Sequence, residues 1–216
     1  GMAEAMRGFI LTPTYRVVGG RAEVHLHAVL EDGGPALIVD DRLTPYFFVR
    51  AADEAATRRL APAARVVPAG LRSLAGEPVV RVELALPGDL PGARSRLAAA
   101  GIECFEADLR FAYRYLIDRG IRGGFTVDGQ SEPRPGVGRV FRNPTLAPAA
   151  FAPALRVLSF DLETSPDAAR VYAASMAGTG GERVLIVAPH AVAGAEAVPD
   201  ERTLLERFLA HVRAAD

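Results

Sequence analysis

Apolar and polar positions alternate along the first part of the chain. Between Arg7 and Val39 short alternating runs are separated by Gly19-Gly20 and by a second turn at 31–34, a pattern that predicts an antiparallel β meander. The alternation is clearest from Arg21 to Leu30, where every second residue is apolar. The chain therefore begins with strands that bury one face and leave the other polar.

A different pattern, with strands and helices in alternation, occupies residues 46–109. The expected strands are 46–50, 65–67, 79–86 and 104–109, and the expected helices are 52–60 and 89–101. Asp89 is placed as the N-cap of the second helix and Gly101 as its C-terminal stop. This β-α-β-β-α-β order is typical of ferredoxin-like folds, so the fold class is α+β with a β-rich N-terminal domain.

The same order occurs in modules that bind single-stranded RNA, which stack bases on aromatic residues of two central strands. Tyr46, Phe47 and Phe48 supply aromatic side chains on the first strand, but the third strand, 79–84, has none. A place in the core is therefore the favoured interpretation of these aromatic residues.

Arginines are frequent from 110 to 142, which makes this segment locally basic. We select Arg114, Arg119 and Arg122 as candidate nucleic-acid-binding residues, although a solvated polar face accounts equally well for them. Prolines, glycines and alanines dominate residues 130–153, which predicts a linker or an irregular crossing between two domains. The expected domains are 1–150 and 151–216.

Two carboxylates follow a short apolar strand in the stretch from Leu155 to Ser165. Because strand side chains alternate, Asp161 and Glu163 are expected on one face and Leu162 on the opposite, packed face. Grouped carboxylates suit Mg²⁺ or Mn²⁺. The alternative is ordinary, since an Asp-x-Glu triplet is common by chance and acidic residues often cap turns or helices.

The remaining chain predicts two strands and a helix. The strands are 170–176 and 184–187, and the helix begins at Pro199-Asp200-Glu201, where acidic residues lie at its positive end. The expected buried stripe of that helix consists of Leu204, Leu205, Phe208, Leu209 and Val212.

Composition excludes several classes of protein. The 216 residues carry a formal net charge of −1, which argues against binding nucleic acid through bulk charge. Cys104 is the only cysteine, so an internal disulfide or a cysteine-clustered metal site is excluded. No apolar run reaches membrane length and no signal peptide is evident, so we expect a cytoplasmic protein with no membrane partner. His25 and His27 share a strand face, but no third metal ligand is evident.

Three stretches in the same order carry a resemblance to a known family. They are Gly8-Phe-Ile-Leu-Thr12, Glu106-Ala-Asp-Leu-Arg110 with the following Arg114-Tyr-Leu116, and Leu158-Ser-Phe-Asp-Leu-Glu-Thr164. Together they resemble the N-terminal part of family B DNA polymerases, most closely the bacterial DNA polymerase II type. The last stretch matches that family's first exonuclease motif, an apolar strand that ends in Asp-x-Glu-Thr.

The resemblance implies an N-terminal domain, partly ferredoxin-like, followed by the start of a 3′→5′ exonuclease domain with a ribonuclease H-like sheet. In that family four acidic residues hold two divalent metal ions, which activate water and clamp the scissile phosphate. Asp161 and Glu163 would be the first two of these acids, with Asp161 bridging both ions. The implied partners are DNA, as template and primer 3′ end, and a sliding clamp. The implied role is in DNA replication and repair synthesis.

The later acidic motifs of the family, Asn-x-x-x-Phe-Asp and Tyr-x-x-x-Asp, do not occur in these 216 residues. Because two of four ligands bind Mg²⁺ weakly, we expect this fragment to lack nuclease activity and to hold no metal on its own. Two alternatives stay open. One is a standalone nucleic-acid-binding module with a polymerase-like fold and no catalysis, and the other is a complete but unusual small nuclease.

Overall fold

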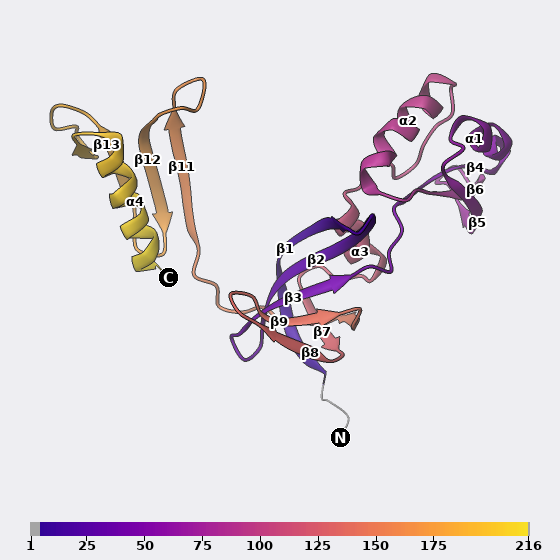
Figure 1. The fold of residues 1–216 in the computed structure, drawn as a ribbon, viewed down its shortest axis with the longest axis horizontal. Helices are drawn as coiled ribbons and strands as arrows, with labels where there is room; N and C mark the ends of the chain where they lie inside the picture. Colours follow the sequence, from indigo (N-terminus) through magenta and orange to yellow (C-terminus); the bar gives the residue numbers. More distant parts are fainter. Residues whose placement is uncertain (1–4, 216) are drawn as a thin grey trace. The chain divides into compact units, whose positions relative to one another are not determined.

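The computed structural model describes residues 5–215 and divides into two compact units, Gly1–Pro153 and Ala154–Asp216 (Figure 1). The division falls at the end of the segment that the sequence predicts as a linker. The structure is mixed α+β and rich in strands, as the sequence predicts. No helix within residues 5–215 is long and apolar enough to cross a membrane.

The first unit contains a sheet of seven strands within the described residues, which we call the large sheet. In spatial order its strands are β10 (Thr145–Pro148), β7 (Gly124–Asp128), β1 (Met6–Val18), β2 (Arg21–Leu30), β3 (Pro35–Asp40), β9 (Gly138–Arg142) and β8 (Ser131–Arg134). Strands β1, β2 and β3 form the predicted antiparallel meander. Gly19 and Gly20 make the first turn with positive φ angles, a conformation that glycine adopts without strain.

One face of the large sheet packs against α3 (Phe111–Asp118). The alternation in β2 places Val24 and Leu26 in this core with no exposed surface, and Tyr115 of α3 is buried against them. Burying such side chains stabilises the fold by about 1.5–3 kcal/mol each before the loss of conformational entropy is counted.

The prediction of a linker over residues 130–153 is wrong for most of its length, because β8, β9 and β10 lie there. Strand β9 pairs in parallel with β3, and β10 pairs with β7, so both pairings join segments far apart in sequence. The prolines are tolerated because β8 and β10 are the edge strands of the large sheet. Gly138 is required where β9 passes Pro35, since a Cβ atom there would lie 2.2 Å from the Pro35 carbonyl oxygen.

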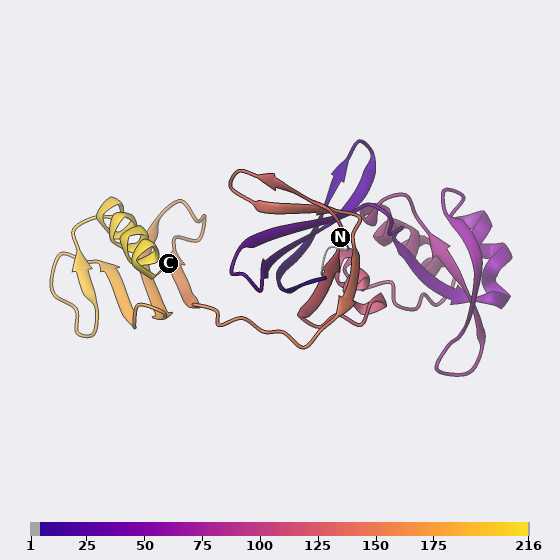
Figure 2. The same cartoon turned by 90° about the horizontal axis from the view of Figure 1, so that it is seen from below.

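A second sheet of the first unit has three strands among the described residues, in the order β4 (Tyr46–Arg50), β6 (Pro78–Glu83) and β5 (Arg65–Arg72). It packs against α1 (Glu54–Leu60) and α2 (Leu90–Ala99), which follow the 3₁₀ turns η1 (Ala51–Asp53) and η2 (Pro87–Asp89). The long β5–β6 hairpin is visible in Figure 2. Both helices occur where the sequence predicts them.

The prediction of a strand at residues 104–109 is wrong. Only an isolated antiparallel bridge between Phe48 and Phe105 forms there, on the side of β4 away from β6. The backbone then turns at Glu106, whose φ of 55° is incompatible with a continuing strand.

The second unit is a four-stranded sheet with one helix within residues 154–215. Its strands are β11 (Leu158–Thr164), β12 (Val171–Gly178), β13 (Arg183–Val187) and β14 (Glu196–Val198), and α4 (Glu201–Ala215) lies across one face of the sheet (Figure 2). As predicted, Asp200 begins the helix, since its Oδ1 accepts a hydrogen bond from the Thr203 N–H at 2.7 Å.

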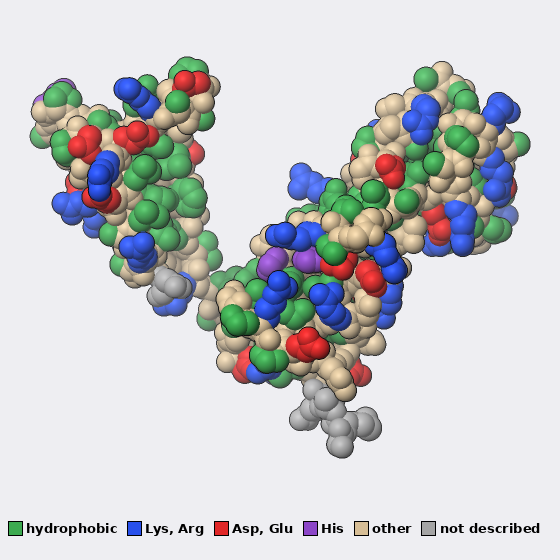
Figure 3. Space-filling view, in the orientation of Figure 1, with side chains coloured by type: hydrophobic (Ala, Val, Ile, Leu, Met, Phe, Trp, Pro, Cys, Tyr) green, Lys and Arg blue, Asp and Glu red, His purple; other side chains and the backbone are tan. Residues whose placement is uncertain are grey.

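The buried stripe predicted for α4 is only partly correct. Leu204 is fully buried, but Leu205 and Leu209 are exposed. Figure 3 shows apolar side chains gathered beside α4 over β11 and β12. The helix therefore covers only part of its side of the sheet.

Candidate carboxylate and nucleic-acid sites

The structure places Asp161 and Glu163 on β11, the edge strand of the second unit. Asp161 lies opposite Ser175 of β12, and Glu163 lies opposite Ala173. Residues directly opposite in antiparallel strands share a face, so the two carboxylates extend over small side chains. The other face packs against α4 through Phe160, whose ring meets that of Phe208 edge-on at 5.2 Å between centroids.

Both carboxylates are exposed. The Asp161 Oδ1 atom accepts a hydrogen bond from the Leu162 N–H at 2.9 Å, a contact between neighbours in sequence. The expectation that Leu162 packs in the core is wrong: it is 36% exposed, because β11 lies at the edge of the sheet and α4 does not cover it. The carboxylate pair is therefore open to solvent on its own face.

Within the described residues no group of three or more His, Cys, Asp or Glu side chains is placed to hold a metal ion. Asp161 and Glu163 supply carboxylate oxygens, the ligand type that Mg²⁺ and Mn²⁺ prefer, but two side chains leave most coordination positions to water. The residues present thus fit part of a divalent metal site. His25 and His27 do not form such a metal site either. His25 is buried beside Glu23, with 2.9 Å between the His25 Nε2 atom and the Glu23 Oε2 atom.

Arg114, one of the candidate nucleic-acid-binding residues, lies inside the first unit and is 5% exposed. Its Nη1 donates to Glu106 Oε2 at 2.6 Å, and its guanidinium carbon lies 4.5 Å from the centre of the Tyr46 ring. These partners occupy the guanidinium group, so we leave Arg114 out of any proposed contact with DNA.

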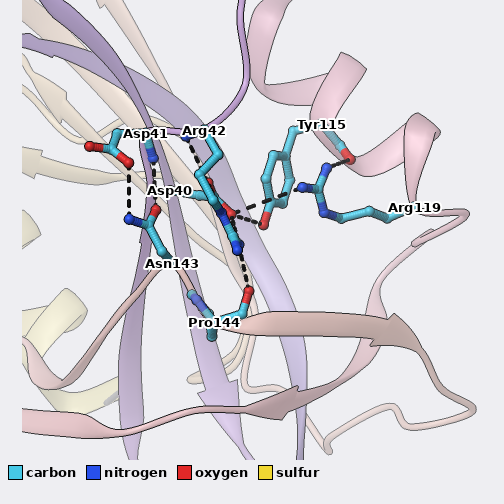
Figure 4. Close-up of polar contacts among 7 residues, drawn as sticks. All are labelled: Asp40, Asp41, Arg42, Tyr115, Arg119, Asn143 and Pro144. Carbon is cyan, nitrogen blue, oxygen red and sulfur yellow. Dashed lines mark hydrogen bonds and ion pairs between the residues drawn. The ribbon is translucent and has the colours of Figure 1, made fainter.

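Arg119 also has internal partners (Figure 4). It donates to the Tyr115 carbonyl oxygen at 3.2 Å, and its guanidinium lies over the Tyr115 ring at 3.5 Å. The Arg119 Nη2 atom lies 4.0 Å from Asp40 Oδ2. The side chain is partly exposed, so one side of the guanidinium remains accessible.

Asp40, which the sequence analysis did not select, organises this polar cluster. It ends β3 with no exposed surface, and it accepts hydrogen bonds from the Arg42 Nη2 at 2.6 Å and from the Tyr115 hydroxyl at 2.8 Å (Figure 4). Burial alone would raise the pKa of Asp40, but hydrogen bonds from Arg42 and Tyr115 outweigh it and lower the pKa. Burial and the bond to Asp40 raise the pKa of Tyr115. The only signal in the sequence for the contact between Asp40 and Tyr115 is weak: an aspartate at the end of an apolar strand.

Arg122 is exposed and has no hydrogen bond or ion pair with another residue in the described part of the chain. It borders a shallow cavity of about 340 Å³, which is otherwise lined by glycines, Pro148 and two alanines. Of the three selected arginines, Arg122 is the one whose guanidinium is free to meet a phosphate group.

A larger cleft of about 760 Å³ lies elsewhere in the first unit. It is lined by β1 from Leu11 to Tyr15, by the start of α2 and by the segment 107–114. Tyr46, Arg94 and Arg110 also line it. No pattern in the sequence indicated this cleft, because residues from separate segments line it.

No protein-family model matches the chain. A curated DNA polymerase from Archaeoglobus fulgidus is 30% identical over 173 residues, which are 74% of this chain and 22% of that polymerase. The solved structure of the family B DNA polymerase from the hyperthermophilic archaeon Pyrobaculum calidifontis matches 98% of this chain with a TM-score of 0.69 and 28% identity. The chain is homologous to family B DNA polymerases.

This homology confirms the resemblance to family B DNA polymerases, and the structure resembles the N-terminal region of these enzymes. The chain spans 22% of the curated polymerase and 29% of the solved polymerase chain, so most of each relative lies outside the match. Both matched polymerases are archaeal, which does not support the bacterial DNA polymerase II type expected from the sequence.

Proposed function

We propose that the chain is the N-terminal part of a DNA polymerase that also carries a 3′→5′ exonuclease, and that it acts in DNA replication and repair synthesis. The observation that supports this most is the match of 98% of the chain to a family B polymerase structure. The ferredoxin-like and ribonuclease H-like assignments of the two units belong to the same proposal, as do the domain limits 1–150 and 151–216.

In the proposed exonuclease, Asp161 and Glu163 supply the first carboxylates of a divalent metal site. Their exposure on the uncovered face of β11 supports this, because a metal ion and a nucleic-acid strand need access from solvent. Mg²⁺ or Mn²⁺ bound there would stabilise the negative charge of the scissile phosphate and would activate a water molecule. Asp161 and Glu163 would supply only two carboxylate ligands to such an ion, so we propose that the fragment by itself has no nuclease activity.

The test compares Asp161→Ala and Glu163→Ala in the longer protein with Asp167→Ala as the matched control. Asp167 is an exposed acid just after β11, and its Oδ1 accepts a hydrogen bond from the Ser165 hydroxyl. We expect the first two changes to abolish the 3′→5′ degradation of a labelled primer and to leave primer extension intact, while Asp167→Ala retains both. Unchanged degradation in Asp161→Ala and Glu163→Ala would contradict the assignment.

The 216-residue chain is tested separately with a single-stranded DNA substrate in Mn²⁺. We expect no cleavage. Cleavage that disappears in Asp161→Ala would contradict the proposed inactivity and favour a small nuclease.

We also propose that Arg122, with the accessible side of Arg119, contacts DNA. The exposed Arg122 guanidinium without a protein partner supports this. Fluorescence anisotropy with single-stranded DNA should show weaker binding for Arg122→Ala and a reduced salt dependence, by about one phosphate contact. Arg59→Ala, an exposed arginine of α1, is the control and should bind as the parent does. Equal binding by all three proteins would remove Arg122 from the interface. A sliding clamp stays a predicted partner of the longer protein.

A further inference from the structure

The first unit has two lobes with separate cores. The large lobe is the large sheet with α3, and the small lobe is the three-stranded sheet with α1 and α2. The buried residues of the two cores have no member in common. The chain crosses between the lobes twice, at 41–45 and again at 108–110, and the cleft of about 760 Å³ is lined by residues of both. Their relative orientation therefore depends on a few contacts at these crossings.

Tyr46 makes polar and aromatic contacts between the lobes. It begins β4 in the small lobe, and its hydroxyl donates to the carboxylate of Asp118 at the end of α3, at 2.8 Å to Oδ2 and 3.0 Å to Oδ1. Its ring contacts the guanidinium of Arg114 from α3 at 4.5 Å and that of Arg81 from β6 at 4.9 Å. An aromatic ring attracts a cation over its face by about 0.5–2 kcal/mol, most strongly when water is excluded.

Arg114 extends this contact to the second crossing. Its Nη1 donates to Glu106 Oε2 at 2.6 Å, and its Nη2 donates to the Glu106 carbonyl oxygen at 3.3 Å. Glu106, the residue with φ 55°, lies in the small lobe just before that crossing, next to the buried Ala107. One buried arginine of the large lobe thus holds both crossings, through Tyr46 at the first and Glu106 at the second.

Burial and the bond to Asp118 raise the pKa of Tyr46 to about 12. The hydroxyl is therefore protonated, and available as a donor, throughout the physiological pH range. Leu86, which lies between β6 and η2, packs against the core of the large lobe.

We propose that Tyr46, Glu106, Arg114 and Asp118 form a clasp that holds the two lobes in one orientation and so sets the width of the cleft between them. When the clasp is broken, the lobes turn about the two crossings and the Leu86 contact, and each lobe keeps its own core. This inference rests on the contacts of the first unit and is independent of the proposed polymerase function.

The test measures the distance between spin labels on the two lobes in the complete 216-residue chain. Labels are attached at Ala75→Cys in the β5–β6 turn and at Glu132→Cys in β8, both exposed, in a Cys104→Ser background. We expect one narrow distance distribution for the parent. Tyr46→Ala and Asp118→Ala should each give a broadened or shifted distribution, with the larger change for Tyr46→Ala because it removes both the hydrogen bond and the stacking surface.

Tyr113→Ala is the matched control, since Tyr113 lines the same cleft from α3 and is exposed. Its distribution should equal that of the parent. Hydrogen exchange of β4 and β6 reports whether the small lobe is still folded, and if Tyr46→Ala unfolds it, Asp118→Ala decides the outcome. The proposal is overturned if Asp118→Ala keeps the parent distribution, or if the parent distribution is already broad.

Discussion

Asp40 and Asp161 are both strand aspartates that follow apolar residues, yet they differ in burial and in hydrogen bonding. Asp40 has no exposed surface, and side chains from α3 and the β3–β4 segment complete its hydrogen bonds. Asp161 is exposed and bonds only to the next backbone N–H among the contacts of the described residues. A carboxylate buried with a full set of donors supports the fold, whereas an exposed one is available for a ligand.

The hydrophobic cores of the two units that contain these residues also differ in size. The large sheet and α3 bury many apolar side chains around Tyr115, but the core cluster of the second unit, within residues 154–215, is small and consists of the buried residues Ala174, Met176, Leu185, Val198 and Leu204. A small core stabilises a short chain only marginally. We infer that stability resides mainly in the first unit, and that the carboxylate pair of β11 lies on the weaker one.

Replacing Asp40 should have the largest effect on the stability of the first unit. Asp40→Ala leaves the Tyr115 hydroxyl buried without an acceptor and removes the carboxylate partner of Arg42, so we expect the free energy of unfolding of the first unit to fall by about 3 kcal/mol. Urea unfolding followed by hydrogen exchange of β2 and β3 measures it. A loss below about 1 kcal/mol would show that Asp40 is not the structural centre of its cluster.

Leu204→Ala should have a comparable effect confined to the second unit. Leu204 has no exposed surface, and the cavity left by its truncation should cost about 3 kcal/mol, enough to unfold so small a core. Leu209→Ala, at an exposed position of the same helix, should change stability by less than about 0.5 kcal/mol. Hydrogen exchange of β12 and β13 distinguishes the two, and equal losses would contradict the observed burial.

Tyr115→Phe removes one hydrogen bond to Asp40 and keeps the ring. Arg42 still donates to the carboxylate, so the free energy of unfolding of the first unit should fall by only about 1 kcal/mol. The same urea series measures it. A loss of stability as large as that of Asp40→Ala would mean that the hydrogen bond from Tyr115, rather than those from Arg42, is the main stabilising contact of Asp40.

Acid should affect the Asp40 region through linkage. The folded pKa of Asp40 is lowered, so its contribution to stability is complete above the ordinary pKa of an aspartate, near 4, and is lost as the pH falls through the lower folded value. Glu31 and Asp32 also have lowered pKa values, so Asp40→Asn is the necessary comparison. Between pH 5 and pH 2, unfolding in urea should show a smaller acid-induced loss of stability for Asp40→Asn than for the parent.

Asp161→Ala should have the smallest effect on stability, within about 0.5 kcal/mol, because the side chain is exposed and close to the like charge of Glu163. Urea unfolding of the second unit tests this beside Asp40→Ala. A loss near that of Asp40→Ala would remove the distinction between the two regions.

Local patterns predicted much of the fold and one of the candidate sites. The β1–β3 meander, α2 and the start of α4 near Asp200 depend on residues close in sequence, so alternation, acidic residues at the helix start and turn glycines were sufficient. The pairings of β9 with β3 and of β10 with β7 were missed, because prolines and glycines in that segment resemble a linker when the partner strands are not known.

The sequence by itself determined that Asp161 and Glu163 share a face, since strand alternation is a local property of the backbone. Only the tertiary structure decided that this face is open, that Leu162 lies at an uncovered edge, and that Arg114 is a buried partner of Tyr46 rather than a surface cation. Burial and charge pairing depend on which distant segments meet, and an amino-acid pattern does not specify those neighbours.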